Sequence, residues 1–239
     1  MSSLSQEILI LPDIHGRTFW KEPLADVSEY EKVVFLGDYL DPYPQEGVTP
    51  HMALDNFMEI IDFAQANKEK AVLLLGNHDL HYVSELYRQR AVSSRYNSSM
   101  KNVYKHLFEE NRNMFFLAWE TTYGDQKVLF THAGVTEGWY NANRNVIGEL
   151  DSEHLNMLME TENGIRTLAQ IGYERGGMFK WGSMVWADLY EMYVSKPFSS
   201  IFQIFGHSQQ HNAPVITRHW ACLDCRRPFL FPATIMGTE

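Results

Sequence analysis

The chain is poor in cysteine, in positive charge and in long hydrophobic runs. Its two cysteines are too few for the disulfide framework of a small secreted domain. The longest apolar runs, such as residues 114–119, fall far short of the roughly 20 residues that span a membrane. The first seven residues lack the basic and apolar stretches of a secretory signal. We therefore expect a cytoplasmic protein with no membrane partner.

The charge balance is acidic, with 20 basic and 30 acidic side chains and a net charge of -10. A chain of this charge repels nucleic acid unless it has a local basic groove, so we expect no nucleic-acid polymer as a partner. The chain also lacks a Pro-, Gly- or Ser-rich linker and any internal repeat. Its 45% hydrophobic content suffices for one large core. We predict a single domain over residues 1–239, with the oligomeric state left open.

Short apolar runs at residues 7–13, 32–38 and 70–77 predict buried strands. Near-continuous apolar strands are covered on both faces, as they are in α/β sheets. Residues 49–67 carry apolar side chains at helical spacing, which predicts a helix between the second and third strands. The first third of the chain is therefore expected to be βαβ-like, and ligands collect at the carboxyl ends of such strands.

The second half of the chain predicts a different arrangement. We expect helices over most of residues 136–192 and strands in six apolar segments. These strands are expected to form a second, largely antiparallel sheet. The six segments are residues 115–121, 127–131, 201–205, 214–217, 220–224 and 228–231.

Polar motifs follow the apolar runs in a fixed order, and the most specific is Gly-Asn-His-Asp at residues 76–79. Asp-Ile-His at 13–15 and Gly-Asp-Tyr-Leu-Asp at 37–41 precede it, while Thr-His-Ala-Gly at 131–134 and Gly-His-Ser at 206–208 follow it. One such triplet is common by chance, but five in order are not. Together they supply the carboxylate, amide and imidazole ligands of a two-metal hydrolytic site.

Two divalent ions about 3.5–4 Å apart can clamp a phosphate ester and generate a hydroxide between them, provided that one carboxylate bridges the ions. Asp38 follows a predicted strand and is the natural bridge. With a neutral amide in the set, the site keeps a net positive charge, which suits an anionic phosphate. The other expected ligands are Asp13, His15, Asn77, His132 and His207.

His78 is the candidate general acid. It is next to Asn77 in the sequence and faces away from the metals if Asn77 faces them. It is then free to protonate the leaving oxygen, a role that histidine fills more often than any other residue. An orienting carboxylate is needed, and Asp41, three residues after the bridge, is the candidate.

The motifs resemble those of the calcineurin-like metallophosphoesterase superfamily, over nearly the whole chain from residue 13 to residue 208. The resemblance implies an α/β (α+β) fold, a four-layer αββα sandwich of two mixed sheets with a dinuclear site at the strand ends. It also implies that His78 and Asp41 form the acid pair. By motif position it assigns one metal to Asp13 and His15, the bridge to Asp38, and the second metal to Asn77, His132 and His207.

Within the superfamily, Asp-Ile-His-Gly at 13–16 and Val-Trp-Ala-Asp at 185–188 are similar to the branch of Ser/Thr protein phosphatases and diadenosine tetraphosphatases. The string at 206–209 lacks the second histidine of many phosphodiesterases, which also favours that branch. There are two departures. Asp79 replaces a usual Glu, and Pro42 stands where the branch usually has a phosphate-binding Arg, which argues against protein phosphatase activity.

The resemblance implies a phosphoesterase that uses a metal-bridging hydroxide, and a phosphomonoesterase resembling the Ser/Thr phosphatases is the leading prediction. The alternatives are a dinucleoside polyphosphate hydrolase and a non-catalytic metal-bound scaffold. A scaffold would have lost a ligand or the acid, and none of these positions is lost. The expected substrate is a phosphorylated small molecule, a nucleotide or a phosphoprotein. The expected cofactors are two divalent ions of manganese, iron or zinc.

Residues 81–113 form a helical, locally basic segment directly after the central motif. This segment could bind phosphate in place of the missing Arg, and the alternative is a solvated helix face. Arg88 and Arg90 are nearest to the motif and, with Arg17, are the candidate substrate contacts. The Cys-x-x-Cys at 222–225 would suit a redox pair or half of a zinc site, but without a second pair we expect ordinary thiols.

Overall fold

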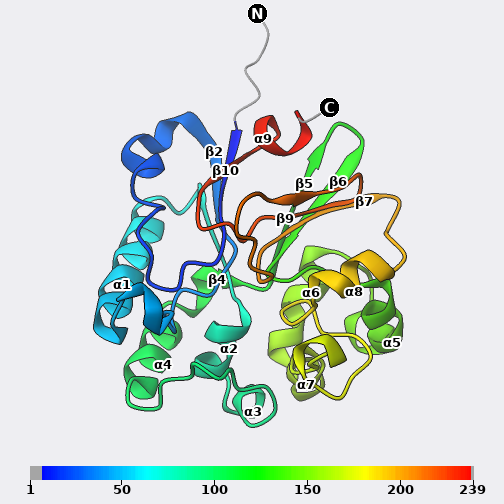
Figure 1. Ribbon diagram of the computed structural model, residues 1–239, viewed down its shortest axis with the longest axis horizontal. Helices are drawn as coiled ribbons and strands as arrows, with labels where there is room; N and C mark the ends of the chain where they lie inside the picture. The colour runs from blue at the N-terminus through cyan, green and yellow to red at the C-terminus, as the bar shows by residue number, and fades with distance from the viewer. Residues whose placement is uncertain (1–6, 238–239) are drawn as a thin grey trace, which may run out of the picture.

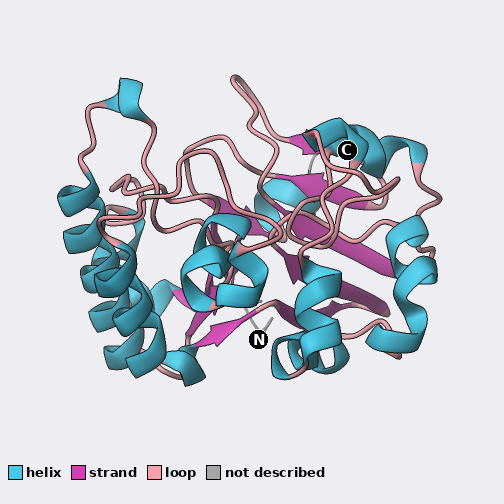
Figure 2. Cartoon of the chain, turned by 90° about the horizontal axis from the view of Figure 1, so that it is seen from below, coloured by secondary structure: helices cyan, strands magenta, loops and turns pink. Residues whose placement is uncertain are grey.

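The computed structural model describes residues 7–237. Two five-stranded sheets occupy its middle, and helices cover the outer faces of both sheets (Figure 1). The view from below shows the helices on the two flanks and the strands between them (Figure 2). The predicted four-layer sandwich with two mixed sheets is therefore confirmed. Residues 1–6, where the sequence shows no secretory signal, lie outside the described residues.

The first sheet has the strand order β10-β1-β2-β3-β4, with parallel pairing from β1 to β4 and an antiparallel edge at β10. The three strands predicted in the first third of the chain are present, and each ends two or three residues early. The remaining residues turn away into the loops that carry the polar motifs. The strands are β1 (Glu7–Leu11), β2 (Tyr30–Phe35), β3 (Ala71–Leu74), β4 (Phe115–Phe116) and β10 (Phe229–Phe231).

The second sheet has the order β5-β6-β7-β9-β8, and the prediction that it is largely antiparallel was wrong. The central strands β6, β7 and β9 pair in parallel, and only the edges β5 and β8 are antiparallel. A long helical crossover joins β6 to β7, which is the connection that parallel neighbours require. The strands are β5 (Ala118–Tyr123), β6 (Gln126–Thr131), β7 (Ile201–Phe205), β8 (Val215–Ile216) and β9 (Trp220–Cys222).

Two of the six predicted segments join different partners from those expected. Residues 115–121 divide at the buried Leu117 into β4, which pairs with β3, and β5, which pairs with β6. Residues 228–231 form β10, which pairs with β1 in the first sheet instead of joining the second. Both errors concern the partner, because the apolar pattern of a strand does not specify which sheet it joins.

The helices of the first half cover the outer face of the first sheet (Figure 1). The predicted helix at 49–67 is present as α1, and the side chain of Thr49 caps its first turn by accepting from the backbone N–H of Met52. The basic segment 81–113 is only partly helical. Its elements and their neighbours are α1 (Pro50–Ala66), α2 (Asn77–Val83), α3 (Glu85–Arg88) and α4 (Lys101–Glu110), with short 3-10 helices at Pro23–Glu29, Pro44–Glu46 and Arg112–Met114.

The helices of the crossover cover the second sheet, as residues 136–192 predicted, although residues 176–188 contain none. No helix in the described part of the chain is both long enough and apolar enough to cross a membrane. These helices are α5 (Glu137–Ile147), α6 (Ser152–Met157), α7 (Glu162–Leu168) and α8 (Leu189–Val194), with 3-10 helices at Leu158–Glu160 and Tyr173–Arg175, and α9 (Ala233–Met236) follows β10.

Successive side chains along the strands of the first sheet point to opposite faces, so the sheet contributes to two hydrophobic cores. Along β1, Ile8 and Ile10 belong to the cluster between the sheets, while Leu9 and Leu11 pack under the outer helices. Successive side chains of a strand point to opposite faces, so strands buried on both sides need apolar residues at every position. The two sheets are thereby pressed together with the carboxyl ends of their central strands at the same edge of the molecule.

Candidate metal centre

All six predicted ligands come from loops at the carboxyl ends of five strands, and the structure brings them together. Within each of two groups, the ligand atoms lie within 4.8 Å of one another. One group contains Asp13, His15 and Asp38, and the other contains Asp38, His132 and His207. Asn77 begins α2, directly after β3, and completes the set.

Asp38 belongs to both groups. Its Oδ2 lies 3.4 Å from His15 Nε2 and 3.5 Å from His132 Nε2. Its Oδ1 accepts a hydrogen bond of 2.9 Å from the backbone N–H of His78. One oxygen is therefore held by the backbone, while the other faces ligands from both sheets, which is the placement that a bridging carboxylate needs.

Backbone carbonyls orient two of the imidazoles. Nδ1 of His15 donates to the carbonyl of Leu40, and Nδ1 of His132 donates to the carbonyl of Leu36, both at 2.8 Å. A carbonyl only accepts, so Nδ1 carries the hydrogen in each ring and Nε2 presents a lone pair. Both lone pairs face the oxygen of Asp38, an arrangement that favours a cation between them.

Asn77 and His207 place further donor atoms close to His132. His132 Nε2 lies 3.1 Å from Asn77 Oδ1 and 3.1 Å from His207 Nδ1. Two carboxylates, three imidazoles and an amide oxygen form a donor set that suits divalent transition metals. The residues present therefore fit two ions.

Two motif glycines leave room for the carboxylates. A Cβ at Gly76 would collide with the Asp38 carboxylate, and a Cβ at Gly206 would collide with that of Asp13. The backbone N–H of His207 lies 3.0 Å from both oxygens of Asp13 and donates to them. Glycine is required at both places because the backbone approaches the carboxylates so closely.

Four of the predicted site residues hold a left-handed backbone conformation that is unusual outside glycine. They are His15 (φ 46°), Asp38 (φ 55°), Asp41 (φ 56°) and His207 (φ 63°). Each such residue costs on the order of 1–3 kcal/mol and persists only where its surroundings hold it in place. The convergence of four of them on one centre indicates that the fold gives up stability to position these side chains.

Burial and neighbouring charges set the protonation of the centre. Burial lowers the pKa of His15 and His207 well below the usual range, so both rings are neutral, the form that binds a metal. Burial opposes ionisation of Asp38, but the surrounding imidazoles, His132 first, outweigh it and lower the pKa of that carboxyl. Burial raises the pKa of Asp13.

His78 is held by Asp41, as the acid pair requires. Its Nδ1 lies 2.9 Å from Asp41 Oδ2, and its Nε2 lies 2.9 Å from Ser93 Oγ. Asp41 also accepts from the Tyr82 hydroxyl, and His81 Nε2 lies 2.8 Å from its Oδ2. Burial alone would raise the pKa of Asp41, but its contacts with both histidines lower it, so the carboxylate stays ionised. Held by these contacts, Asp41 fixes the orientation of His78.

Arg95 is a site residue that the motifs did not reveal. Its Nη2 lies 3.1 Å from His78 Nε2 and 3.2 Å from His15 Nε2. Its Nε donates to the backbone carbonyl of Asp41 at 3.0 Å. That contact places the guanidinium beside Pro42, the position from which the protein-phosphatase branch presents its phosphate-binding Arg. The sequence indicated the basic segment 81–113 as a possible phosphate-binding region, but it did not single out Arg95 within that segment.

A second arginine lines the same cavity. Arg175 donates to Ser208 Oγ at 2.6 Å and pairs with Asp188 at 2.8 Å. The Arg95 guanidinium is held from its other side by the ring of Tyr43, 3.7 Å below it. The cavity has a volume of about 290 Å³, and both arginines line it together with His15, Asn77, His78 and His207.

The three arginines chosen from the sequence lie outside this cavity. Arg17 pairs with both oxygens of Glu46 at 2.8 and 2.9 Å and donates to the carbonyl of Asp13. Arg88 pairs with Glu85 on its own helix. Arg90 lines a neighbouring groove. Contact of these three with substrate stays a prediction.

Both cysteines are free thiols. Cys222 is buried in β9, and its thiol lies 3.4 Å from the carbonyls of Gly206 and Ser208. Burial raises the pKa of Cys225 to about 11. A thiol that stays protonated is a poor nucleophile and a poor metal ligand, and Cys222 instead supports the loop that carries His207.

Comparison with known proteins identifies the family. Residues 7–208 match the family described as calcineurin-like phosphoesterase, and the chain belongs to it. Members of this family typically bind two divalent metals, in agreement with the buried His/Asp groups. The chain is therefore a metal-dependent phosphoesterase. No curated protein matches it in sequence.

Solved structures are similar at low identity. One is the hypothetical protein PH1004 from Pyrococcus horikoshii OT3, with 15% identity and a TM-score of 0.37 over 54% of this chain and 55% of that chain. The match therefore spans about half the length of that protein. Another is a protein serine/threonine phosphatase from Saccharomyces cerevisiae with similarity to human phosphatase PP5, with 12% identity and a TM-score of 0.48 over 93% of this chain and 68% of that chain.

Proposed function

We propose that this phosphoesterase hydrolyses phosphate monoesters, as a single catalytic domain, with manganese as the first metal to test. The observation that supports this proposal most directly is one small cavity. The proposed acid His78, the proposed bridge Asp38 and two guanidiniums all line it. A monoester dianion carries more charge than a diester. Two arginines beside two divalent ions therefore favour the monoester.

The ions, when bound, supply a nucleophile from water and neutralise phosphate oxygens. We assign the first ion to Asp13 and His15, and the bridge to Asp38. The second ion is assigned to the side chains that meet around His132 Nε2. These assignments are supported by the shared oxygen of Asp38 and by the imidazole lone pairs that face it.

The protein itself supplies the proton. In the protonated imidazole of His78, Nδ1–H donates to Asp41 and Nε2–H faces the cavity, where it can pass to the leaving oxygen. The guanidinium of Arg95 lies 3.1 Å from the same Nε2, so a phosphate bound there would be next to the acid. Arg175 also lines the cavity and would orient the remaining phosphate oxygens.

A dinucleoside polyphosphate hydrolase is the second candidate. The observation that favours it is the groove beside the cavity, which contains Arg90 and Arg166 and could hold further phosphates. In that case the same metals and the same acid would act on a phosphoanhydride instead of a phosphomonoester.

The deciding experiment compares phenyl phosphate, bis(p-nitrophenyl) phosphate and diadenosine tetraphosphate with manganese, iron or zinc added in turn. We expect phenyl phosphate to give a higher kcat/KM than the diester. A preference for the diester would contradict the monoester proposal, and a preference for diadenosine tetraphosphate would favour the second candidate. Full metal binding without turnover of any substrate would support a non-catalytic scaffold.

A further inference from the structure

We propose that a groove beside the catalytic cavity binds the leaving group of the substrate, and that this leaving group carries an aromatic ring and a second phosphate, as a nucleotide does. The inference rests on the proposed phosphoesterase function and assigns a substrate class to the same centre. The groove has a volume of about 560 Å³, within the range of small-ligand sites.

Two chain segments connect the groove to the cavity. Along residues 89–95, Arg90 lines the groove and Arg95 lines the cavity. Along residues 171–177, Ile171 lines both spaces. The two spaces therefore adjoin at Ile171 and are linked by these two segments, so a ligand whose phosphate lies in the cavity can extend into the groove.

The wall formed by the second segment is preformed. The N–H of Tyr173 donates to the carbonyl of Phe179 at 2.8 Å, and the N–H of Phe179 donates to the carbonyl of Ile171 at 3.2 Å. The N–H of Gly177 donates to the carbonyl of Gly172 at 2.9 Å. Because these backbone donors are already paired, the loop is poorly suited to hold an extended peptide by strand pairing.

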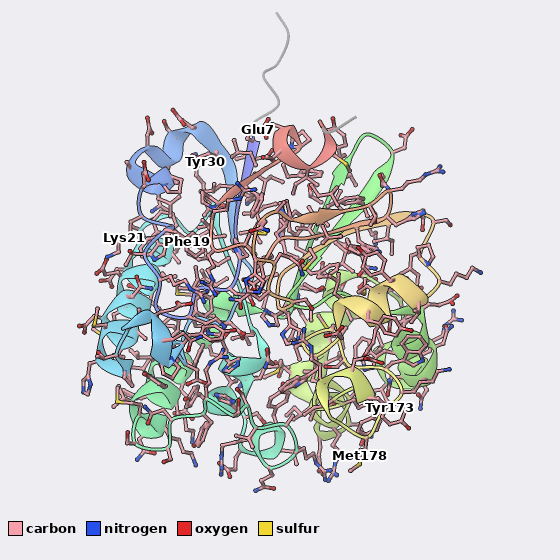
Figure 3. All side chains as sticks on the ribbon, in the orientation of Figure 1. Glu7, Phe19, Lys21, Tyr30, Tyr173 and Met178 are labelled. Atoms are coloured by element: carbon pink, nitrogen blue, oxygen red, sulfur yellow. The ribbon has the colours of Figure 1, made fainter. Side chains whose placement is uncertain are left out.

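Large apolar side chains are exposed on this loop. Tyr173 is 62% exposed, Met178 is 81% exposed and Phe179 is 42% exposed. Figure 3 shows Tyr173 and Met178 close together at the outer rim of the molecule. An exposed apolar cluster next to a catalytic cavity indicates a binding surface. Met178 and Phe179 line the groove itself and offer a thioether and an aromatic face to a planar ring.

The other segment contributes a free cation. Arg90 is exposed and forms no ion pair with any carboxylate among residues 7–237. The second arginine of the groove, Arg166, is already paired with Glu162. A phosphate at Arg90 would gain a charge-assisted hydrogen bond without breaking an existing one.

The apolar wall and the free cation of Arg90 together indicate which class of ligand the groove would bind. A simple aryl phosphate has no second phosphate for Arg90. Inorganic polyphosphate would use Arg90 but leave Phe179 and Met178 exposed to water. A nucleoside diphosphate presents a terminal phosphoryl group that is charged like that of a monoester. Hydrolysis of its phosphoanhydride releases inorganic phosphate and a nucleotide, which has the second phosphate for Arg90 and a base for the apolar wall.

The test is steady-state kinetics of Phe179→Ala and Arg90→Gln with ADP, pyrophosphate and phenyl phosphate as substrates. We expect the KM for ADP to rise about three- to tenfold in each variant, because stacking and charge-assisted contacts have that size. For pyrophosphate only Arg90→Gln should raise KM, and for phenyl phosphate neither should. Matched controls outside the groove are Lys101→Gln, which removes a half-buried charge paired with Glu85, and Tyr190→Ala, which removes an exposed aromatic ring.

Equal effects on all three substrates, or no effect on ADP, would overturn the groove assignment while leaving the phosphoesterase proposal intact. A phosphopeptide whose KM responds to Phe179→Ala while that of ADP does not would show a peptide in the groove and also overturn it. Inactivity toward every substrate would instead contradict the proposed function. In that case, calorimetry of AMP binding to the metal-free protein decides about the groove, since both variants should weaken AMP binding and both controls should not.

Discussion

The two ring nitrogens of His78 lie in different environments, as a general acid requires. Its Nδ1 is tied to the buried, ionised Asp41, and its Nε2 opens onto the cavity beside Ser93 and Arg95. The Asp41 carboxylate fixes the ring, and a phosphate bound at Arg95 would lie next to the Nε2 that delivers the proton.

Replacement of His78 by Asn tests the acid role. We expect kcat to fall by about 10²–10⁴ with metal content unchanged, since the proposed acid acts in the transition state and is not among the proposed ligands. The loss should be smaller with p-nitrophenyl phosphate than with phenyl phosphate, because nitrophenolate leaves without a proton. Equal losses on the two substrates would argue against proton donation by His78.

Replacement of Arg95 by Gln tests the guanidinium beside position 42. We expect KM for phenyl phosphate to rise about tenfold or more with a smaller change in kcat, because an arginine that binds phosphate holds ground and transition states alike. Arg95→Lys should restore part of the binding, since charge is kept but the planar fork is lost. Lys101→Gln serves as the control, and metal analysis excludes an indirect effect through His15. An unchanged KM in Arg95→Gln would remove this residue from the site.

The predicted ligands could be chosen from sequence because each motif is contiguous and follows a strand. A residue such as Asn77 needs only the end of β3 to bring it to the centre. Arg95 could not be chosen in this way. It reaches the centre through residues 89–100, which contain no helix or strand, and its position depends on contacts with Asp41 and Tyr43 that no spacing reveals.

At the scale of the element, Asp79 joins the loops that follow β2 and β3. Its carboxylate accepts from the backbone N–H groups of Asp38 at 2.7 Å, Tyr39 at 3.0 Å and Gly76 at 2.8 Å. Asp79→Asn replaces one acceptor oxygen with a donor that faces other donors. We expect the free energy of unfolding to fall by about 1–3 kcal/mol, measured by urea denaturation, and metal affinity to fall with it. Unfolding at the wild-type urea concentration would show that the loops do not depend on this carboxylate.

The first turn of α8 contains another buried carboxyl group, that of Glu191, and this group makes the stability of the fold depend on pH. Burial raises the pKa of Glu191 from 4.5 to about 7, and one of its oxygens accepts from the N–H of Gly182. Between these two pH values the folded chain holds a proton that the unfolded chain has released, so stability falls as pH rises through that window. Glu191→Gln should therefore lose less stability than wild type between pH 5 and pH 8 in melting experiments. Parallel pH profiles of Tm would contradict this assignment.

The elements themselves were largely predictable, and their partners were not. The run at 201–205 matches β7 residue for residue, because five buried residues between polar ends leave little choice. The division of 115–121 between two sheets depends on which neighbours the chain meets on either side of Leu117. That information comes from contacts far apart in the sequence, and local periodicity does not contain it.

For the whole molecule, the candidate metal centre also joins the two sheets. Loops of the first sheet supply Asp13, His15, Asp38 and Asn77, and loops of the second supply the remaining two histidines. We expect close to two equivalents of metal per chain, with chelation lowering Tm and added manganese restoring it, because an ion that binds only the folded state stabilises it. Asp38→Asn should lower the occupancy of both positions. An identical Tm with and without metal would show that the sheets are held together independently of the ions.

The pairing of β10 with β1 has a consequence for biosynthesis. β1 (Glu7–Leu11) is synthesised more than 200 residues before its antiparallel neighbour β10 (Phe229–Phe231). Until then, the apolar first strand presents an open edge, the kind of surface that attracts other unfinished chains. A chain released early, at residue 208, would contain every predicted ligand and the acid pair and would still lack the strand that closes this edge. During synthesis, therefore, the chain acquires all of its predicted catalytic residues before it acquires the strand that protects β1 from aggregation.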